Sequence, residues 1–153
     1  MKATKRRVWL RSVVGAAAAA ALMGSAWGQE TLKIGLLTNL EGPFAVPGQD
    51  GFRGADMALK EKNGMAGGKK IEFVRGSSDG SPDSAVKAAR KLVEQDGVQI
   101  LIGPLSGDEG LAIKDYAKTQ PNVTFINGTS AAQDTTLRDP APNFYRFTTD
   151  GAQ

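Results

Sequence analysis

The segment 98–102, Val-Gln-Ile-Leu-Ile, limits the possible folds of this chain more than any other stretch, because it is short and almost wholly apolar. The chain-breaking pair Gly103-Pro104 follows it directly. A short apolar run bounded by such residues is typical of a strand buried on both faces, as in a parallel sheet. The segment therefore predicts a central strand of an α/β fold.

A helix is predicted to begin just after this strand, at Ser106. Ser106 and Glu109 have the spacing of a capping box, and apolar residues follow at helical intervals. A strand that leads into a helix N-terminus leaves backbone N–H groups facing the space above the sheet, where a polar or anionic ligand group can bind. The Ser106 hydroxyl therefore has two possible roles, helix capping alone or capping together with ligand binding.

Strands and helices alternate along the rest of the chain. The alternation implies right-handed βαβ units and an α/β fold with an open parallel sheet and helices on both faces. Ligands bind above the carboxyl ends of such strands, where the strand order reverses, so we expect the loops 39–48, 103–107 and 128–133 to form the site. The expected strands are residues 31–38, 70–75, 98–102, 123–127 and 143–148, and the expected helices are residues 49–62, 82–96 and 106–120.

Residues 1–28 have the layout of a secretory signal peptide. A basic head precedes an alanine-rich apolar segment, residues 13–23, and cleavage after Ala26 or Gly28 satisfies the preference for small residues. The apolar segment is too short to span a bilayer stably. The order Arg6-Arg7-Val8-Trp9-Leu10 resembles a twin-arginine export signal. Paired arginines also occur in ordinary signal peptides, so both export routes remain open.

The basic character of the chain belongs to this signal. Five of the 19 Lys and Arg residues lie in residues 1–28, which leaves 14 against 16 Asp and Glu residues and a net charge near −2. The remaining chain therefore gives no support to a nucleic-acid-binding surface.

The residue types that are missing exclude several functions. The sequence has no Cys and no His, so disulfides, a cysteine-linked lipid anchor, zinc sites and Ser-His-Asp chemistry are excluded. Neither a Gly-x-Gly-x-x-Gly motif after the first strand nor a phosphate-binding loop occurs, and no cofactor is predicted. Asp79 and Asp83 fit a polar turn and a helix start better than a calcium site. We expect a protein that binds a molecule and is not an enzyme.

Six motifs occur in order along the chain after the signal. Together they resemble the start of a periplasmic binding protein of the branched-chain amino-acid type, the Leu/Ile/Val-binding-like solute receptors of ABC importers. The motifs are Ile34-Gly-Leu-Leu-Thr-Asn-Leu-Glu-Gly-Pro43, Gly48-x-x-Gly-x-x-Gly-Ala-Asp-x-Ala58, Asp79-Gly-Ser-Pro-Asp83, Val98-Gln-Ile-Leu-Ile-Gly-Pro-Leu-Ser106, and Phe125-Ile-Asn-Gly-Thr-Ser130 followed by Arg146-Phe-Thr-Thr-Asp-Gly151.

The resemblance implies a two-lobed periplasmic protein that closes on its ligand and delivers it to an inner-membrane ABC permease. Residues 29–153 then correspond to the N-terminal lobe of a type I periplasmic binding protein, with the second lobe missing. In the family, the first lobe holds the ligand carboxylate with hydroxyls and backbone N–H groups after the third and fourth strands. Carried over to this chain, the ligand-binding residues are Ser106, Gly107, Thr129, Ser130 and Ala131, with Phe44 or Pro47 as an apolar wall.

One departure from the family leaves the ligand class open. Amino-acid binders have a run of hydroxyl residues near the position of Ser106, whereas Asp108 and Glu109 occur here. Acidic side chains that faced the site would repel an anionic ligand. An amino acid, an aromatic or short carboxylate, or an amide all fit the resemblance. A sensor receptor of the same fold that feeds a signalling partner is an alternative function, and an exported enzyme using Ser130 is a weaker one.

Overall fold

The computed structural model describes residues 30–151, so the predicted export signal lies outside the described residues. The order of strands and helices agrees with the sequence prediction, with one additional short strand. The elements are β1 (Thr31–Asn39), η1 (Gly42–Phe44), α2 (Ala45–Glu61), β2 (Met65–Ala66), β3 (Lys69–Ser78), α3 (Pro82–Arg90), the π-helical turn η2 (Lys91–Gln95), β4 (Ile100–Ile102), α4 (Gly107–Ala117), β5 (Thr124–Asn127), η3 (Gln133–Thr135) and β6 (Phe144–Arg146).

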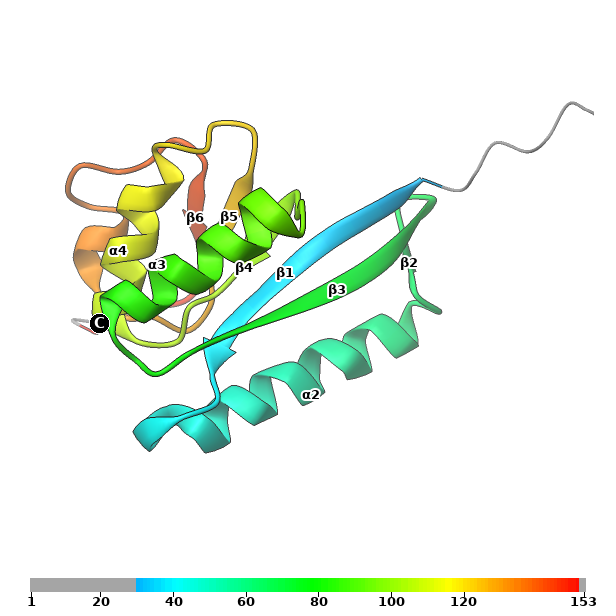
Figure 1. Ribbon diagram of the computed structural model, residues 1–153, viewed down its shortest axis with the longest axis horizontal. Helices are drawn as coiled ribbons and strands as arrows, with labels where there is room; N and C mark the ends of the chain where they lie inside the picture. The colour runs from blue at the N-terminus through cyan, green and yellow to red at the C-terminus, as the bar shows by residue number, and fades with distance from the viewer. Residues whose placement is uncertain (1–29, 152–153) are drawn as a thin grey trace, which may run out of the picture.

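The strands form one sheet in the order β2-β3-β1-β4-β5-β6 (Figure 1). All neighbouring pairs are parallel except β2 and β3, so the predicted open parallel sheet is confirmed, with one short antiparallel strand added at this edge. Gly67 and Gly68 join β2 to β3 and have φ angles of 56° and 79°. Positive φ at both central residues is what a two-residue hairpin turn requires. The strand order reverses beside β1, which is where ligands bind in open α/β sheets.

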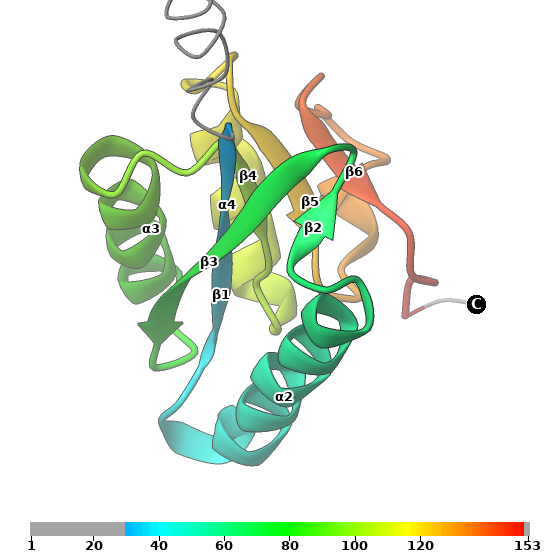
Figure 2. The same ribbon diagram turned by 90° about the vertical axis from the view of Figure 1, so that its right-hand side faces the viewer.

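Helices lie on both faces of the sheet, as predicted. α3 and α4 pack together on one face, and α2 packs on β1 on the opposite face (Figures 1 and 2). The Arg75 guanidinium on β3 bonds both carboxylate oxygens of Asp56 on α2 at 2.6 Å. On its face of the sheet, α2 packs against β1 and contacts β3. On β6, at the edge of the sheet, the Tyr145 side chain is 57% exposed.

The hydrophobic core lies between the sheet and the pair α3 and α4. Leu101 on β4, Phe125 on β5 and Ile113 on α4 have no exposed surface. The Tyr116 ring meets the Phe125 ring edge-on, with centroids 6.0 Å apart. Strand residues that face this core alternate with residues that face α2, as the pleat requires.

Several elements have different bounds from those predicted; among them, α4 ends at Ala117 and β6 is limited to Phe144–Arg146. α2 begins at Ala45, not at residue 49, and includes Pro47 in its first turn, where the missing N–H leaves no helical bond unmade. β3 extends to Ser78 because it pairs with β1 along the whole length of β1. β4 begins at Ile100, not at residue 98, and the Val98 N–H bonds the Leu92 carbonyl of η2 instead of a neighbouring strand.

Replacement of a buried core leucine should destabilise the fold far more than replacement of an exposed one. Leu101 has no exposed surface, whereas Leu137 is 65% exposed. In the purified natural protein, Leu101→Ala should lower the free energy of unfolding by about 2–5 kcal/mol. Leu137→Ala should change it by less than about 0.5 kcal/mol. Denaturant unfolding followed by circular dichroism measures both values, and equal effects would contradict the assigned core.

Candidate functional site

The loops at the carboxyl ends of the parallel strands are packed closely against one another. A Cβ on Gly48, at the start of α2, would lie 1.7 Å from the Asn39 carbonyl oxygen. A Cβ on Gly128, after β5, would lie 2.6 Å from the Pro104 carbonyl oxygen after β4. A Cβ on Gly103 would likewise lie 2.1 Å from the Leu37 carbonyl oxygen of β1. The absence of side chains at these positions therefore permits the ends of β1, β4 and β5 to pack together along one edge.

The N-terminus of α4 supplies hydrogen-bond donors at this edge. Ser106 caps the helix, and its Oγ accepts a hydrogen bond from the Glu109 N–H at 3.4 Å. The Ser106 N–H donates to Glu109 Oε2 at 3.2 Å, which completes the predicted capping box. Gly107 and Asp108 occupy the first helical turn, where backbone N–H groups have no acceptor within the helix. Ser106 and Gly107 are half-buried and Asp108 is exposed.

The Glu109 side chain points away from solvent and into the protein. Its carboxylate is fully buried, and its Oε1 accepts hydrogen bonds from Asn39 Nδ2 at 3.1 Å and from the Ser78 hydroxyl. Asn39 and Ser78 are the last residues of β1 and β3. Sequence reasoning found the capping box but missed this network, since no local pattern links residues so far apart in the chain.

The loop after β5 places its predicted residues in two different environments. Thr129 and Ala131 are exposed at the edge. The Ser130 side chain is fully buried, and its Oγ has no hydrogen-bond partner among the described residues. Asn127 Nδ2 donates to the Ser130 carbonyl at 2.8 Å. A Cβ on Gly110 of α4 would lie 2.2 Å from Ser130 Oγ, so this hydroxyl faces the helix.

A buried ion pair lies next to the loop after β5. Arg146 and Asp150 lie 3.4 Å apart, with side chains only 11% and 7% exposed. The Arg146 guanidinium also donates to the Ala132 carbonyl at 3.4 Å, and the Gly151 N–H donates to the Ala131 carbonyl at 2.9 Å. Arg146 and Asp150 belong to the sequence motif at residues 146–151, but the motif alone did not predict this ion pair.

The structure brings most of the predicted site residues together, and Phe44 lies apart from them. A Cβ on Gly107 would lie 3.4 Å from the Ala132 Cβ, so the start of α4 borders the loop after β5. Phe44 is 40% exposed and lies beside Gly80, on the β1 and β3 side of the edge. Phe44 therefore stands across the edge from the polar group of residues.

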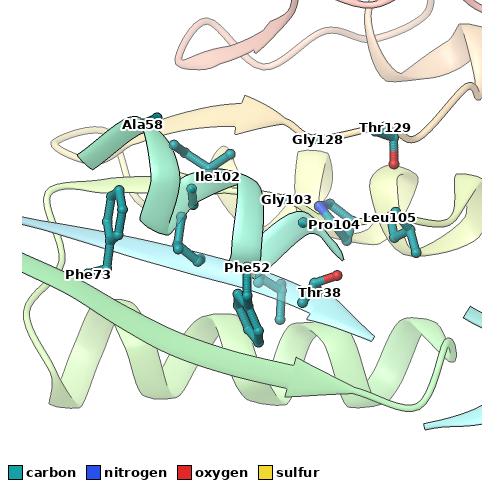
Figure 3. A pocket seen from close by; sticks show the side chains of 14 residues that line it. Thr38, Phe52, Ala58, Phe73, Ile102, Gly103, Pro104, Leu105, Gly128 and Thr129 are labelled. Atoms are coloured by element: carbon teal, nitrogen blue, oxygen red, sulfur yellow. The ribbon is translucent and has the colours of Figure 1, made fainter. Parts of the chain in front are cut away.

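An apolar groove lies below this edge, between α2 and the sheet (Figure 3). Its volume is about 280 Å³. Of the predicted ligand-binding residues, Thr129 lines this groove. The groove lies on the α2 face of the sheet, whereas α4, which carries Ser106 and Gly107 at its start, lies on the opposite face. The lining residues are Leu36, Leu37, Thr38, Gly51, Phe52, Ala55, Ala58, Phe73, Ile102, Gly103, Pro104, Leu105, Gly128 and Thr129.

Asp79 is an exposed acidic residue in the loop directly after β3. Hydrogen bonds from the Ser81 hydroxyl and N–H lower the pKa of Asp79, which keeps this exposed carboxyl ionised.

Among residues 30–151, no group of three or more acidic, Cys or His residues could hold a metal ion. No helix in this part of the chain is long and apolar enough to cross a membrane.

Comparison with known proteins identifies the family. A family model described as periplasmic binding protein matches residues 31–153. The chain belongs to this periplasmic binding protein family. A Leu/Ile/Val-binding protein of Rhizobium johnstonii is 31% identical over 109 residues, which cover 70% of this chain and 29% of that protein. The chain thus spans less than a third of the length of the first curated relatives that it matches.

Two solved transporter binding proteins share the fold and differ in the bound molecule. The branched-chain amino acid binding protein LivJ of Streptococcus pneumoniae, in complex with isoleucine, has a TM-score of 0.71 and 26% identity over 79% of this chain and 34% of that one. A solute-binding protein of an ABC transporter of Rhodopseudomonas palustris, in complex with 3,4-dihydroxybenzoic acid, has a TM-score of 0.71 and 26% identity over 78% of this chain and 32% of that one.

Gly110→Ala should destabilise the protein although alanine normally favours a helix by about 1 kcal/mol. The new Cβ would overlap Ser130 Oγ, and overpacking of this kind costs about 1–3 kcal/mol. Gly54→Ala in α2 is the matched control, because a Cβ there meets nothing within 4 Å. Thermal unfolding of the natural protein should show a lower midpoint for the first variant and an equal or higher one for the second. A stabilising Gly110→Ala would contradict the described contact between α4 and the loop.

Proposed function

We propose that this chain forms the N-terminal, ligand-binding lobe of an extracytoplasmic solute-binding protein of an ABC importer. In this proposal, residues 1–28 direct export, and residues 29–153 belong to the first lobe of a soluble periplasmic protein. A ligand is captured between two lobes and delivered to an inner-membrane permease without chemical conversion. Membership of the periplasmic binding protein family supports this role. The solved relatives support it too, because one is named as a solute-binding protein of an ABC transporter and the other as the substrate-binding protein of a transporter.

The observation that carries the proposal is the meeting of the α4 N-terminus with the loop 128–132 at the carboxyl edge of the sheet. Ser106 and Gly107 supply a hydroxyl and a backbone N–H, and the exposed Thr129 and Ala131 face the same edge. We assign these groups to the polar part of the ligand. Ser130 contributes through its backbone in this proposal, because its hydroxyl is buried against Gly110.

The ligand class that best fits is a small amphipathic molecule with a carboxylate. Isoleucine and 3,4-dihydroxybenzoic acid, the molecules bound by two relatives, share a carboxyl group and an apolar body. Glu109 points inward, and its oxygens accept hydrogen bonds within the protein, so this one of the two acidic side chains does not face such a ligand. Asp108 remains exposed in the first turn of α4. We therefore place both amino acids and aromatic acids within the proposed class.

A ligand panel tests this proposal directly. The natural protein should be melted with isoleucine, leucine, valine, benzoate, 4-hydroxybenzoate and 3,4-dihydroxybenzoate, with acetamide as a neutral comparison. A ligand present at 100 times its dissociation constant should stabilise the folded state by about 2.7 kcal/mol. Calorimetry reads the shift of the unfolding midpoint. Failure of every carboxylate to shift a cooperatively unfolding protein would contradict the proposed ligand class.

Two helix-capping serines separate a binding role from a capping role. Ser106 caps α4 at the proposed site, and Ser81 caps α3 in the same way, accepting from the Ser84 N–H at 3.3 Å. Either alanine variant should lower the free energy of unfolding by about 1 kcal/mol. Only Ser106→Ala should also weaken the binding of the ligand that the panel identifies, by about tenfold. Equal affinities of the two variants, measured by isothermal titration, would remove Ser106 from the site.

A further inference from the structure

One buried carboxylate connects three elements at the carboxyl edge of the sheet. Glu109 belongs to α4, and its two oxygens accept hydrogen bonds on opposite sides. Oε2 accepts from the Ser106 N–H at 3.2 Å, and Oε1 accepts from Asn39 Nδ2 at 3.1 Å and from the Ser78 hydroxyl. A helix cap at a protein surface requires the first of these bonds alone.

The second half of the network is suited to a carboxylate. Asn39 Nδ2 donates to Ser78 Oγ at 3.2 Å as well as to Glu109, so both of its N–H bonds point toward this cluster. The Ser78 hydroxyl accepts one bond and donates another. Oε1 therefore receives two donors in a region where Asn39, Ser78 and Glu109 are all at most 3% exposed. Hydrogen bonds to a buried charged group are strong and costly to lose.

We propose that Glu109 is a positioning residue that fixes the first turn of α4 to the ends of β1 and β3. In this role it holds the Ser106 hydroxyl and the Gly107 N–H at a set position before any ligand arrives. The consequence for ligand affinity rests on the proposed function, whereas the anchoring of α4 does not. Gly110, the next residue, contacts Ser130, so consecutive residues attach α4 to the strands on one side and to the loop after β5 on the other.

The neighbouring serines Ser77 and Ser78 provide the test, because only one of them reaches Glu109. Ser77 Oγ accepts from the Leu40 N–H at 3.2 Å and makes no bond to Glu109, whereas Ser78 donates to Glu109 Oε1. Among the described residues, no hydrogen bond joins either serine to Ser106 itself. A local capping box should therefore not respond to either change, and an anchored one should respond to Ser78→Ala.

Hydrogen exchange of the ligand-free natural protein measures the anchoring. The Ser106 and Glu109 amides should exchange at least about tenfold faster in Ser78→Ala than in Ser77→Ala, because a weakened anchor lets the first turn of α4 open more often. Glu109→Gln should accelerate the same amides further, since an amide cannot accept on both sides. Equal exchange in the two serine variants would overturn the proposal. Should Glu109→Gln not fold, the serine pair still decides the question.

Ligand affinity provides the second measurement. Binding of isoleucine and of 3,4-dihydroxybenzoate should be measured well below the unfolding midpoint, where nearly all of each variant is folded. A purely structural Glu109 predicts a lower midpoint with unchanged affinity, and that result would overturn the positioning role. The proposal predicts affinity about tenfold weaker in Ser78→Ala than in Ser77→Ala. If the unmodified protein binds neither probe, the ligand class fails, and the exchange experiment still tests the anchor.

Discussion

The close approach of backbone segments at the carboxyl ends of β1, β4 and β5 is the constraint on which the rest of the site depends. Gly48, Gly103 and Gly128 each lie against a carbonyl oxygen of a neighbouring segment, at distances that no side chain would permit. Because these loops cannot separate without losing that contact, the start of α4 and the loop after β5 meet over the sheet. The positions of the hydrogen-bond donors at this edge are therefore set mainly by the packing of the backbone.

Buried polar groups next to these loops then fix the position of α4 and of the loop after β5. Glu109 joins α4 to the ends of two strands, and Arg146 with Asp150 supports the loop 131–133. Both features are almost fully buried, where an unsatisfied charge is costly. Under the proposed function these residues belong to the first of two lobes, and a firmly anchored first lobe would suit ligand capture by motion between the lobes.

Local signals in the sequence were sufficient for the main strands and helices but not for the short strand β2 or for the interactions between elements. The α4 cap and the Ser81 cap were predicted, because a capping box or N-cap lies within four residues of chain. The bond between Ser78 and Glu109 spans 31 residues, and no periodicity reports it. The same limit applies to Ser130: its place after a strand was predicted, but the burial of its hydroxyl depends on the absence of a side chain at Gly110.

The contact between Gly110 and Ser130 also restricts how this sequence can change over time. The two positions share one small volume. A methyl group added at position 110 on α4 therefore requires a smaller side chain at position 130 in the loop. A change of ligand that calls for a larger residue in the loop after β5 must therefore pass through a compensating exchange in the second turn of α4. Substitutions at these two positions should accordingly occur in pairs among related proteins, with their combined side-chain volume nearly constant.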